Sequence, residues 1–268
     1  MRAWINGRED ERIDPMDRGL HYGDGLFETL AAQDGRARFL DWHLERLVES
    51  AARLAIPLPD TEVLRAEIAA ACATDRGIVK LIVTRGTGER GYRSPRRPEP
   101  MRIVIGLPWP ALPPAAWTSG VRVGWCRTRL GRNPTLAGIK HLNRLEQVLA
   151  RAEWDDERMA ESLMMDDRDR AICGTQTNLF ALIGGRWTTP VLDQCGVAGV
   201  MRRAFMTWAA ERGDPAIERA LPAADIADAT AMLLTNAVIG AWPVSELAGR
   251  ALAVDPRAAE FNTWVLRQ

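Results

Sequence analysis

Apolar and polar residues follow one another in the first hundred positions in a way that predicts both strands and helices. Apolar stretches at 3–5 and 26–31 are typical of strands, and GIVKLIVT (77–84) and MRIVIG (101–106) predict buried strands. Between them, residues 40–54 place leucine, valine and alanine at helical spacing, and 61–72 predict a second helix. The first part of the chain is therefore expected to mix helices and strands.

The stretch 107–120 (LPWPALPPAAWTSG) holds four prolines and a glycine, which disfavours regular structure and predicts a linker. We therefore expect an N-terminal α/β domain over 1–114 and a C-terminal domain over 115–268. Within the second domain the pattern predicts strands at 121–126, 162–165, 179–183 and 231–234, and helices at 143–154, 198–212 and 257–266. Short strands with interspersed helices favour a barrel-like or open mixed sheet, so the fold class is α+β.

Composition narrows the possible functions. Apolar residues make up 47% of the 268 residues, and 35 basic residues balance 35 acidic ones, so no net charge favours nucleic acid or an anionic membrane. Apolar stretches fall far short of the ~20 residues that a membrane span needs. The first ten residues turn polar where a signal peptide would be apolar, so we expect a cytoplasmic protein.

Cysteines and histidines give no sign of a metal site. The four cysteines show no CxxC spacing and the three histidines are scattered, so neither a zinc site nor a disulfide framework is predicted. Free thiols in a reducing compartment are the plain interpretation.

Lysine is scarce: Lys80 and Lys140 are the two lysines of the sequence, and the other 33 basic residues are arginines. Arginine cannot form an imine, so Schiff-base chemistry would have two candidate amines. Lys80 lies inside an apolar strand pattern. Lys140 lies in a polar, glycine-bearing segment before a predicted helix, where it could project into a cleft or simply be a solvated surface lysine.

Several motifs carry a family resemblance. DRGLHYGDGLFE (17–28) and HLERL (43–47) resemble the N-terminal signature of the class IV pyridoxal-phosphate enzymes, the D-amino acid and branched-chain type. Within that superfamily, RGTGERGY (85–92), LGRNPTLAGIKHLNRLEQVL (130–149), LDQCGVAGVMR (192–202) and TNA (235–237) resemble the aminodeoxychorismate lyases. The resemblance covers essentially the whole chain. It implies a two-domain fold of type IV with a larger barrel-like C-terminal domain, and a homodimer in which a loop of one subunit closes the other's pocket.

The resemblance also assigns residues to the cofactor, pyridoxal 5'-phosphate. It implies that Lys140 forms a Schiff base with the cofactor and later shuttles protons. Arg46 aligns with the phosphate-binding arginine of the family, although an exposed helical arginine is the alternative. The remaining cofactor-binding positions are Asn178, the backbone N–H groups of Val200 and Met201, and the Asn236–Ala237 turn. A helix that begins after Gly199 would present unpaired N–H groups to a phosphate.

One position departs from the family pattern. Alignment of ICGTQTNLF (172–180) places Cys173 where the family has a glutamate that keeps the pyridine nitrogen protonated. A thiol cannot hold a pyridinium as a carboxylate does, so the electron sink is expected to be weaker. Either the reaction tolerates this, because formation of an aromatic product supplies driving force, or the activity has been lost.

For the substrate, Arg90 and Tyr92 align with the carboxylate-binding positions of related D-amino acid enzymes, which suits a small dicarboxylate. Thr29 either faces the cofactor pocket or is a core strand residue. The resemblance therefore implies a 4-amino-4-deoxychorismate lyase that releases 4-aminobenzoate and pyruvate for folate synthesis. A class IV transaminase of D- or branched-chain amino acids and a non-catalytic pyridoxal-phosphate-binding protein are the alternatives.

Overall fold

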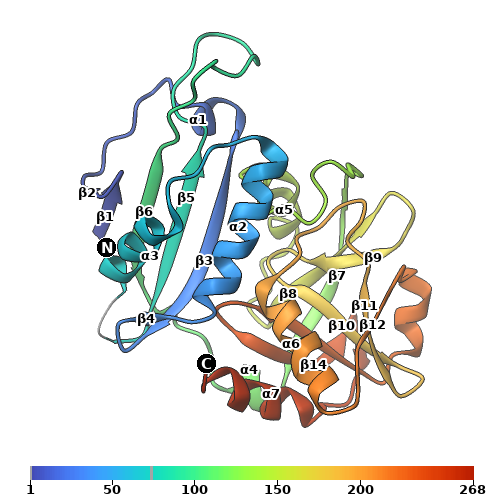
Figure 1. Cartoon of the computed structure of the whole chain (residues 1–268). Helices are drawn as coiled ribbons and strands as arrows, with labels where there is room; N and C mark the ends of the chain where they lie inside the picture. Colours follow the sequence, from blue (N-terminus) through green and yellow to red (C-terminus); the bar gives the residue numbers. More distant parts are fainter. Residues whose placement is uncertain (1, 73–74) are drawn as a thin grey trace. The chain divides into compact units, whose positions relative to one another are not determined.

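The computed structural model describes residues 2–72 and 75–268, and the chain divides into two compact units (Figure 1). Unit 1 comprises the residues up to Ala111 together with Ile139–Asn143, and unit 2 comprises Leu112–Gly138 and Arg144–Gln268. The sequence predicted two continuous domains, 1–114 and 115–268. The structure differs because Ile139–Asn143 packs with unit 1, which it joins by backbone pairing.

Unit 1 is a six-stranded sheet with helices α2 and α3 on one face (Figure 1). Its strands, in the order in which they lie in the sheet, are β2 (Arg8–Glu9), β1 (Arg2–Ile5), β6 (Arg102–Pro108), β5 (Gly77–Thr84), β3 (Gly25–Gln33) and β4 (Arg36–Ala37). Its helices are α1 (Arg18–Tyr22), α2 (Leu40–Leu54) and α3 (Thr61–Ala71). Every neighbouring pair of strands is antiparallel.

Side chains of β3 point alternately to the two faces of the sheet, so every second residue enters the core. Leu26 and Leu30 are fully buried in a core shared with Leu44 and Leu47 of α2 and Ile68 of α3. Phe27 and Thr29, which alternate with these core residues, therefore lie on the opposite face of the sheet. All four stretches for which the sequence predicted strands or helices within 26–84 are confirmed, and the strand predicted at 101–106 runs from Arg102 to Pro108.

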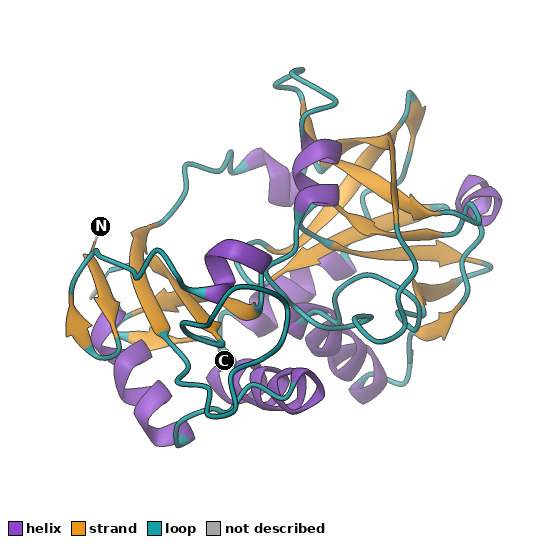
Figure 2. Cartoon of the chain, turned by 90° about the horizontal axis from the view of Figure 1, so that it is seen from above, coloured by secondary structure: helices purple, strands orange, loops and turns teal. Residues whose placement is uncertain are grey.

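Unit 2 contains a closed barrel. Its sheet runs in the order β12 (Ile217–Arg219), β11 (Arg186–Pro190), β10 (Asn178–Ile183), β13 (Ala231–Asn236), β14 (Gly240–Leu247), β7 (Val121–Leu130), β8 (Met159–Asp166) and β9 (Ala171–Gly174), and β15 (Arg250–Ala251) pairs with β14. Because β9 also pairs with β10, the strands from β10 to β9 form a ring of six. Figure 2 shows these strands in orange and the helices in purple.

The helical elements of unit 2 are α4 (Ala115–Thr118), α5 (Leu145–Arg151), α6 (Val200–Glu211), the 3-10 helix η1 (Ala223–Asp228) and α7 (Arg257–Val265). Helices α6 and α7 meet through fully buried aromatic rings: Phe205 lies 4.5 Å from Phe180, 5.6 Å from Trp187 and 5.2 Å from Phe261 between ring centroids.

Three predictions for this part of the chain need correction. The linker expected at 107–120 contains the end of β6 and the short α4. The helix expected at 143–154 is shorter: it begins at Leu145, after Arg144 with φ −124° and ψ 23°, and ends at Arg151. Strands β9, β11, β12, β14 and β15 were not predicted. No helix among the described residues is long and apolar enough to cross a membrane.

Candidate active site

Lys140 lies on a short segment that extends the sheet of unit 1 beyond β3. The N–H of Phe27 donates to the carbonyl of Lys140 at 3.0 Å, and the N–H of Leu142 donates to the carbonyl of Gly25 at 3.0 Å. A Cβ at Gly25 would lie 2.6 Å from the carbonyl oxygen of Val83 on β5, so only glycine fits at this end of β3. The backbone of Lys140 is therefore fixed by the sheet.

The amine of Lys140 lies over an aromatic face. Its Nζ is 4.1 Å from the centroid of the Phe27 ring, within cation–π distance. The Nζ of Lys80 lies 5.5 Å from the same ring, and Lys80 pairs across β5 and β3 with Thr29. Phe27 and Thr29 alternate with the core residues of β3, so the predicted substrate residue Thr29 lies on the face of the sheet away from that core.

Glu28 projects to the core side of the sheet, where its carboxylate binds two polar side chains of α2. Its carboxylate accepts a hydrogen bond from the Nδ1 of His43 at 2.6 Å and from the Nε of Arg46 at 2.8 Å, with a second contact from Arg46 Nη2. Burial opposes ionisation of Glu28, yet the charge of Arg46 and the hydrogen bond from His43 lower its pKa to about 2. Glu28 therefore remains a carboxylate and holds the guanidinium of Arg46 in a fixed plane.

His43 stays neutral in this cluster. Burial lowers its pKa against the opposing effect of Glu28, and the positive charges of Arg46 and Lys140 lower it further. The sequence predicted a binding role for Arg46 but missed Glu28 and His43. Both stand in the motifs that carried the resemblance, and a carboxylate on the core-facing side of a strand was the available signal.

In unit 2, helix α6 begins where Asn178 meets Gly199. The side chain of Asn178 donates to the carbonyl of Val197 at 2.8 Å, and a Cβ on Gly199 would lie 1.9 Å from Asn178 Oδ1. Gly199, the N-cap of α6, therefore has to be glycine. The N–H groups of Val200 and Met201 have no hydrogen-bond partner in the described part of the chain, as the first turn of a helix leaves them.

The strands of the barrel bring the other predicted residues of unit 2 close to Asn178. Asn178 pairs in register with Cys173 on β9 and with Thr235 on β13. Asn236 donates from its side chain to the carbonyl of Gln176 at 3.4 Å, and its side-chain oxygen accepts the N–H groups that follow Ala237. Cys173, Asn178 and the Asn236–Ala237 turn therefore form one cluster at the start of β10.

Two further residues of this cluster were not singled out from the sequence. The hydroxyl of Thr235 is buried and has no hydrogen-bond partner among the residues that the structure describes. Glu161 on β8 is also buried, and its carboxylate accepts the N–H groups of Thr175 and Gln176 and the hydroxyl of Thr175. Glu161 thus fixes the loop between Cys173 and Asn178.

Cys173 is a thiol and not a thiolate in this setting. Burial raises its pKa well above the usual range, and the nearby charge of Glu161 raises it further, against the effect of Arg144. A protonated thiol can donate only a weak hydrogen bond and carries no charge. The structure therefore offers no carboxylate in the position that Cys173 occupies.

The predicted substrate residues Arg90 and Tyr92 lie on the loop between β5 and β6. Tyr92 is 85% exposed, and its ring meets that of Tyr22 at 5.3 Å between centroids. The side chain of Arg90 is exposed and forms no hydrogen bond or ion pair with the rest of the described chain. The structure thus leaves both side chains accessible to a ligand.

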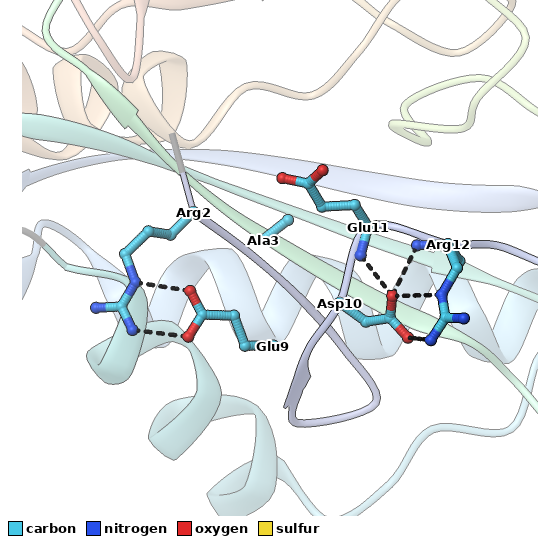
Figure 3. A pocket seen from close by; sticks show the side chains of 6 residues that line it. All are labelled: Arg2, Ala3, Glu9, Asp10, Glu11 and Arg12. Atoms are coloured by element: carbon cyan, nitrogen blue, oxygen red, sulfur yellow. Dashed lines mark hydrogen bonds and ion pairs between the residues drawn. The ribbon is translucent and has the colours of Figure 1, made fainter.

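A separate pocket of about 460 Å³ opens at the first hairpin of unit 1 (Figure 3). Its charged side chains pair with each other: Arg2 with Glu9 at 3.0 Å, and Arg12 with Asp10 at 3.1 Å. These pairs are already satisfied, so the pocket shows none of the chemistry found around Lys140.

The Glu28 cluster makes the stability of the protein sensitive to acid. An unfolded chain protonates His43 below about pH 6.5, whereas burial lowers the pKa of His43 in the folded protein, so stability falls as pH drops below that value. Stability from Glu28 is complete above about pH 4.5 and is lost as pH falls toward 2. We expect His43→Asn, which keeps a donor to Glu28, to flatten the decline between pH 6.5 and 5 in denaturant unfolding. The exposed His21→Asn is the control, and equal slopes for both variants would contradict the assignment.

The chain is similar to known proteins over nearly its whole length. The sequence profile of the aminotransferase class IV family matches residues 25–247. The aminodeoxychorismate lyase of Vibrio harveyi is 34% identical, with 94% of this chain and 93% of that protein covered. The crystal structure of 4-amino-4-deoxychorismate lyase from Pseudomonas aeruginosa is 47% identical, with a TM-score of 0.95 over 99% of this chain and 98% of that one. The PLP-bound form of a hypothetical aminotransferase from Mycobacterium tuberculosis shares the fold, with 24% identity and a TM-score of 0.84 over 99% and 97% of the two chains. The chain therefore belongs to the aminotransferase class IV family.

Proposed function

We propose that this chain is a pyridoxal-phosphate-dependent lyase that converts 4-amino-4-deoxychorismate into 4-aminobenzoate and pyruvate. The observation that carries the proposal is the fixed position of Lys140, on the motif shared with the aminodeoxychorismate lyases and anchored to β3 by backbone hydrogen bonds. We also propose a cytoplasmic location, which the four free cysteine thiols of the chain support.

The residues present fit this cofactor. Lys140 is an amine that can condense with its aldehyde, and Arg46 is a guanidinium suited to its phosphate. Unit 2 offers the N–H groups of Val200 and Met201, and Thr235 has a buried hydroxyl whose hydrogen-bonding capacity is unused within the described residues. When bound, pyridoxal phosphate supplies an aldehyde that captures the substrate amine and a conjugated ring that accepts electron density from the adjacent carbon.

Lys140 is the group that moves the proton. With the cofactor bound, the amine of Lys140 would take the proton from the ring carbon that bears the substrate nitrogen. Departure of the enolpyruvyl group then makes the ring aromatic. Glu28 holds Arg46 in place during this sequence, and His43 remains neutral, so the buried cluster keeps a constant charge.

A class IV transaminase is the competing function. Transamination returns a proton to the cofactor and benefits from a protonated pyridine, which the thiol of Cys173 cannot maintain. The test is to mix the holoenzyme with 4-amino-4-deoxychorismate and, separately, with D-alanine and a keto-acid acceptor. Release of 4-aminobenzoate supports the lyase. Transfer of the D-alanine amino group without 4-aminobenzoate release would assign a transaminase, and neither product would assign a binding protein.

Lys140 is expected to hold the cofactor. Borohydride reduction of the holoenzyme followed by peptide mapping should place the cofactor mass on Lys140. Lys80 is a built-in control, because its amine approaches the same Phe27 ring from the neighbouring strand. Labelling of Lys80 in place of Lys140 would overturn the assignment.

Cys173 is expected to set the balance between elimination and transamination. Cys173→Glu would place a carboxylate at the position where the family has one, so we expect a changed cofactor absorption spectrum and a rise in D-alanine transamination relative to lyase turnover. Cys126→Ser, a change at another buried cysteine of the same apolar cluster, serves as the control. If Cys173→Glu alters neither the spectrum nor the ratio, Cys173 does not lie beside the ring.

We also propose a homodimer, with the exposed face of α5 as part of the interface. Leu145, Val148 and Leu149 are 76%, 61% and 61% exposed and share one face of the helix at i, i+3 and i+4. A second copy of the chain would cover them. Sedimentation at micromolar concentration should give twice the chain mass, and Val148→Asp should weaken the association. A fully active monomer would contradict the proposal.

A further inference from the structure

Arg18 is a buried arginine whose guanidinium organises the loop that carries Arg90 and Tyr92. Its Nη1 donates to the carbonyls of Gly91 at 3.1 Å and Arg93 at 3.3 Å, and its Nη2 donates to the carbonyl of Tyr92 at 3.0 Å. Its Nε donates to the carboxylate of Asp24 at 2.9 Å. Three successive carbonyls are thus turned toward one cation.

The loop is also fixed from its other side. The guanidinium of Arg18 stacks over the Tyr22 ring at 5.0 Å, and the hydroxyl of Tyr22 accepts the N–H of Gly91 at 3.3 Å. Asp24 stays ionised: burial opposes this, but hydrogen bonds from Arg85 and Arg18 lower its pKa below the usual range. The cation at the centre of the loop is therefore paired with a permanent charge.

The orientation of these carbonyls dictates where the neighbouring N–H groups point. In a trans peptide the N–H of each residue is antiparallel to the preceding C=O, and no peptide bond of the described chain is cis. The N–H groups of Tyr92, Arg93 and Ser94 therefore point away from Arg18, and none has a hydrogen-bond partner within residues 2–72 and 75–268. Because the carbonyls converge on Arg18, these N–H groups diverge from one another on the exposed side of the loop.

The side chains of the loop add positive charge. Arg90, Arg93, Arg96 and Arg97 are all exposed, and none forms an ion pair with the described residues. We propose that Arg18 is a positioning residue: it presets this loop so that the guanidinium of Arg90 binds a carboxylate of the substrate. This deepens the proposed function, and it rests on that function for the identity of the substrate.

Arg85 provides a matched control for Arg18. Its Nε donates to the same carboxylate oxygen of Asp24 at 2.8 Å, and its other nitrogens donate to the carbonyls of Leu54 and Ala55 at the end of α2. Arg85→Lys therefore disturbs the same buried charge network without touching the carbonyls of residues 91–93.

The experiment compares Arg18→Lys with Arg85→Lys in the holoenzyme. We expect Arg18→Lys to raise the KM for 4-amino-4-deoxychorismate about tenfold with kcat changed less than about threefold, since a lysine cannot hold three carbonyls and Asp24 at once. Arg85→Lys should leave both constants near the wild-type values. Equal effects of the two variants, or a loss confined to kcat, would overturn the proposal.

Two measurements test the loop without relying on lyase activity. Isophthalate, a dicarboxylate probe, should bind about tenfold more weakly to Arg18→Lys by calorimetry, and trypsin should cleave after the loop arginines about tenfold faster. If the wild-type protein shows no lyase activity, the proposed function fails, and these two measurements still decide the role of Arg18. Unchanged binding and cleavage would refute that role.

Tyr22→Phe is the milder variant for the case in which Arg18→Lys does not fold. It removes the hydroxyl that accepts the Gly91 N–H and keeps the ring beneath the guanidinium. Isophthalate binding weakened by about twofold to threefold, with faster trypsin cleavage, supports the proposal. Wild-type binding and cleavage in this variant would overturn it.

Discussion

The backbone pairing between residues 140–142 and the edge of β3 is the constraint on which the proposed chemistry depends. It places the carbonyl of Lys140 against the N–H of Phe27, sends Ile139 into the core of unit 1, and leaves the lysine amine over the Phe27 ring. A lysine on a free loop would lose backbone conformational entropy each time it was brought into position to react. The backbone of Lys140 is fixed in advance, so this cost is avoided. Gly25, whose carbonyl accepts the Leu142 N–H, has no room for a Cβ, which would lie 2.6 Å from the carbonyl oxygen of Val83 and 2.8 Å from Leu142 Cδ1.

Unit 1 uses arginine in its interior by sharing each buried carboxylate between two donors. Glu28 binds Arg46 and His43, and Asp24 binds Arg18 and Arg85. A buried charge without a partner is strongly destabilising, but each of these groups is paired and hydrogen-bonded. The pairing also gives direction to the cations, because a guanidinium held on one edge by a carboxylate presents its remaining nitrogens along defined lines. The paired arginines thus fix helix α2, through Arg46, and the loop between β5 and β6, through Arg18.

The sequence predicted the elements whose patterns are local and left out those that depend on distant partners. Helix α2 and strand β5 were predicted with their observed limits, because α2 carries a period of 3.6 and β5 is an apolar stretch interrupted only by Lys80. Strands β9 and β11 are short, and nearly all their residues are buried on both faces of a closed barrel, so no alternation marks them. For the site, the motifs predicted roles for Lys140, Arg46 and Asn178. They could not show that Glu28, Glu161 and Arg18 hold the surrounding segments, because those hydrogen bonds join residues far apart in the chain or on different elements.

The cluster in unit 2 departs from the family pattern at Cys173, where a protonated thiol replaces the carboxylate of a glutamate. We assign the decisive step to Lys140, as the base that removes the ring proton before aromatisation. The most direct test of this role is the rate of 4-aminobenzoate formation by Lys140→Ala, with Lys80→Ala as the control. We expect Lys140→Ala to be slower by about a thousandfold or more and to be partly restored by added methylamine, while Lys80→Ala keeps a near wild-type rate. A near wild-type rate for Lys140→Ala would contradict it.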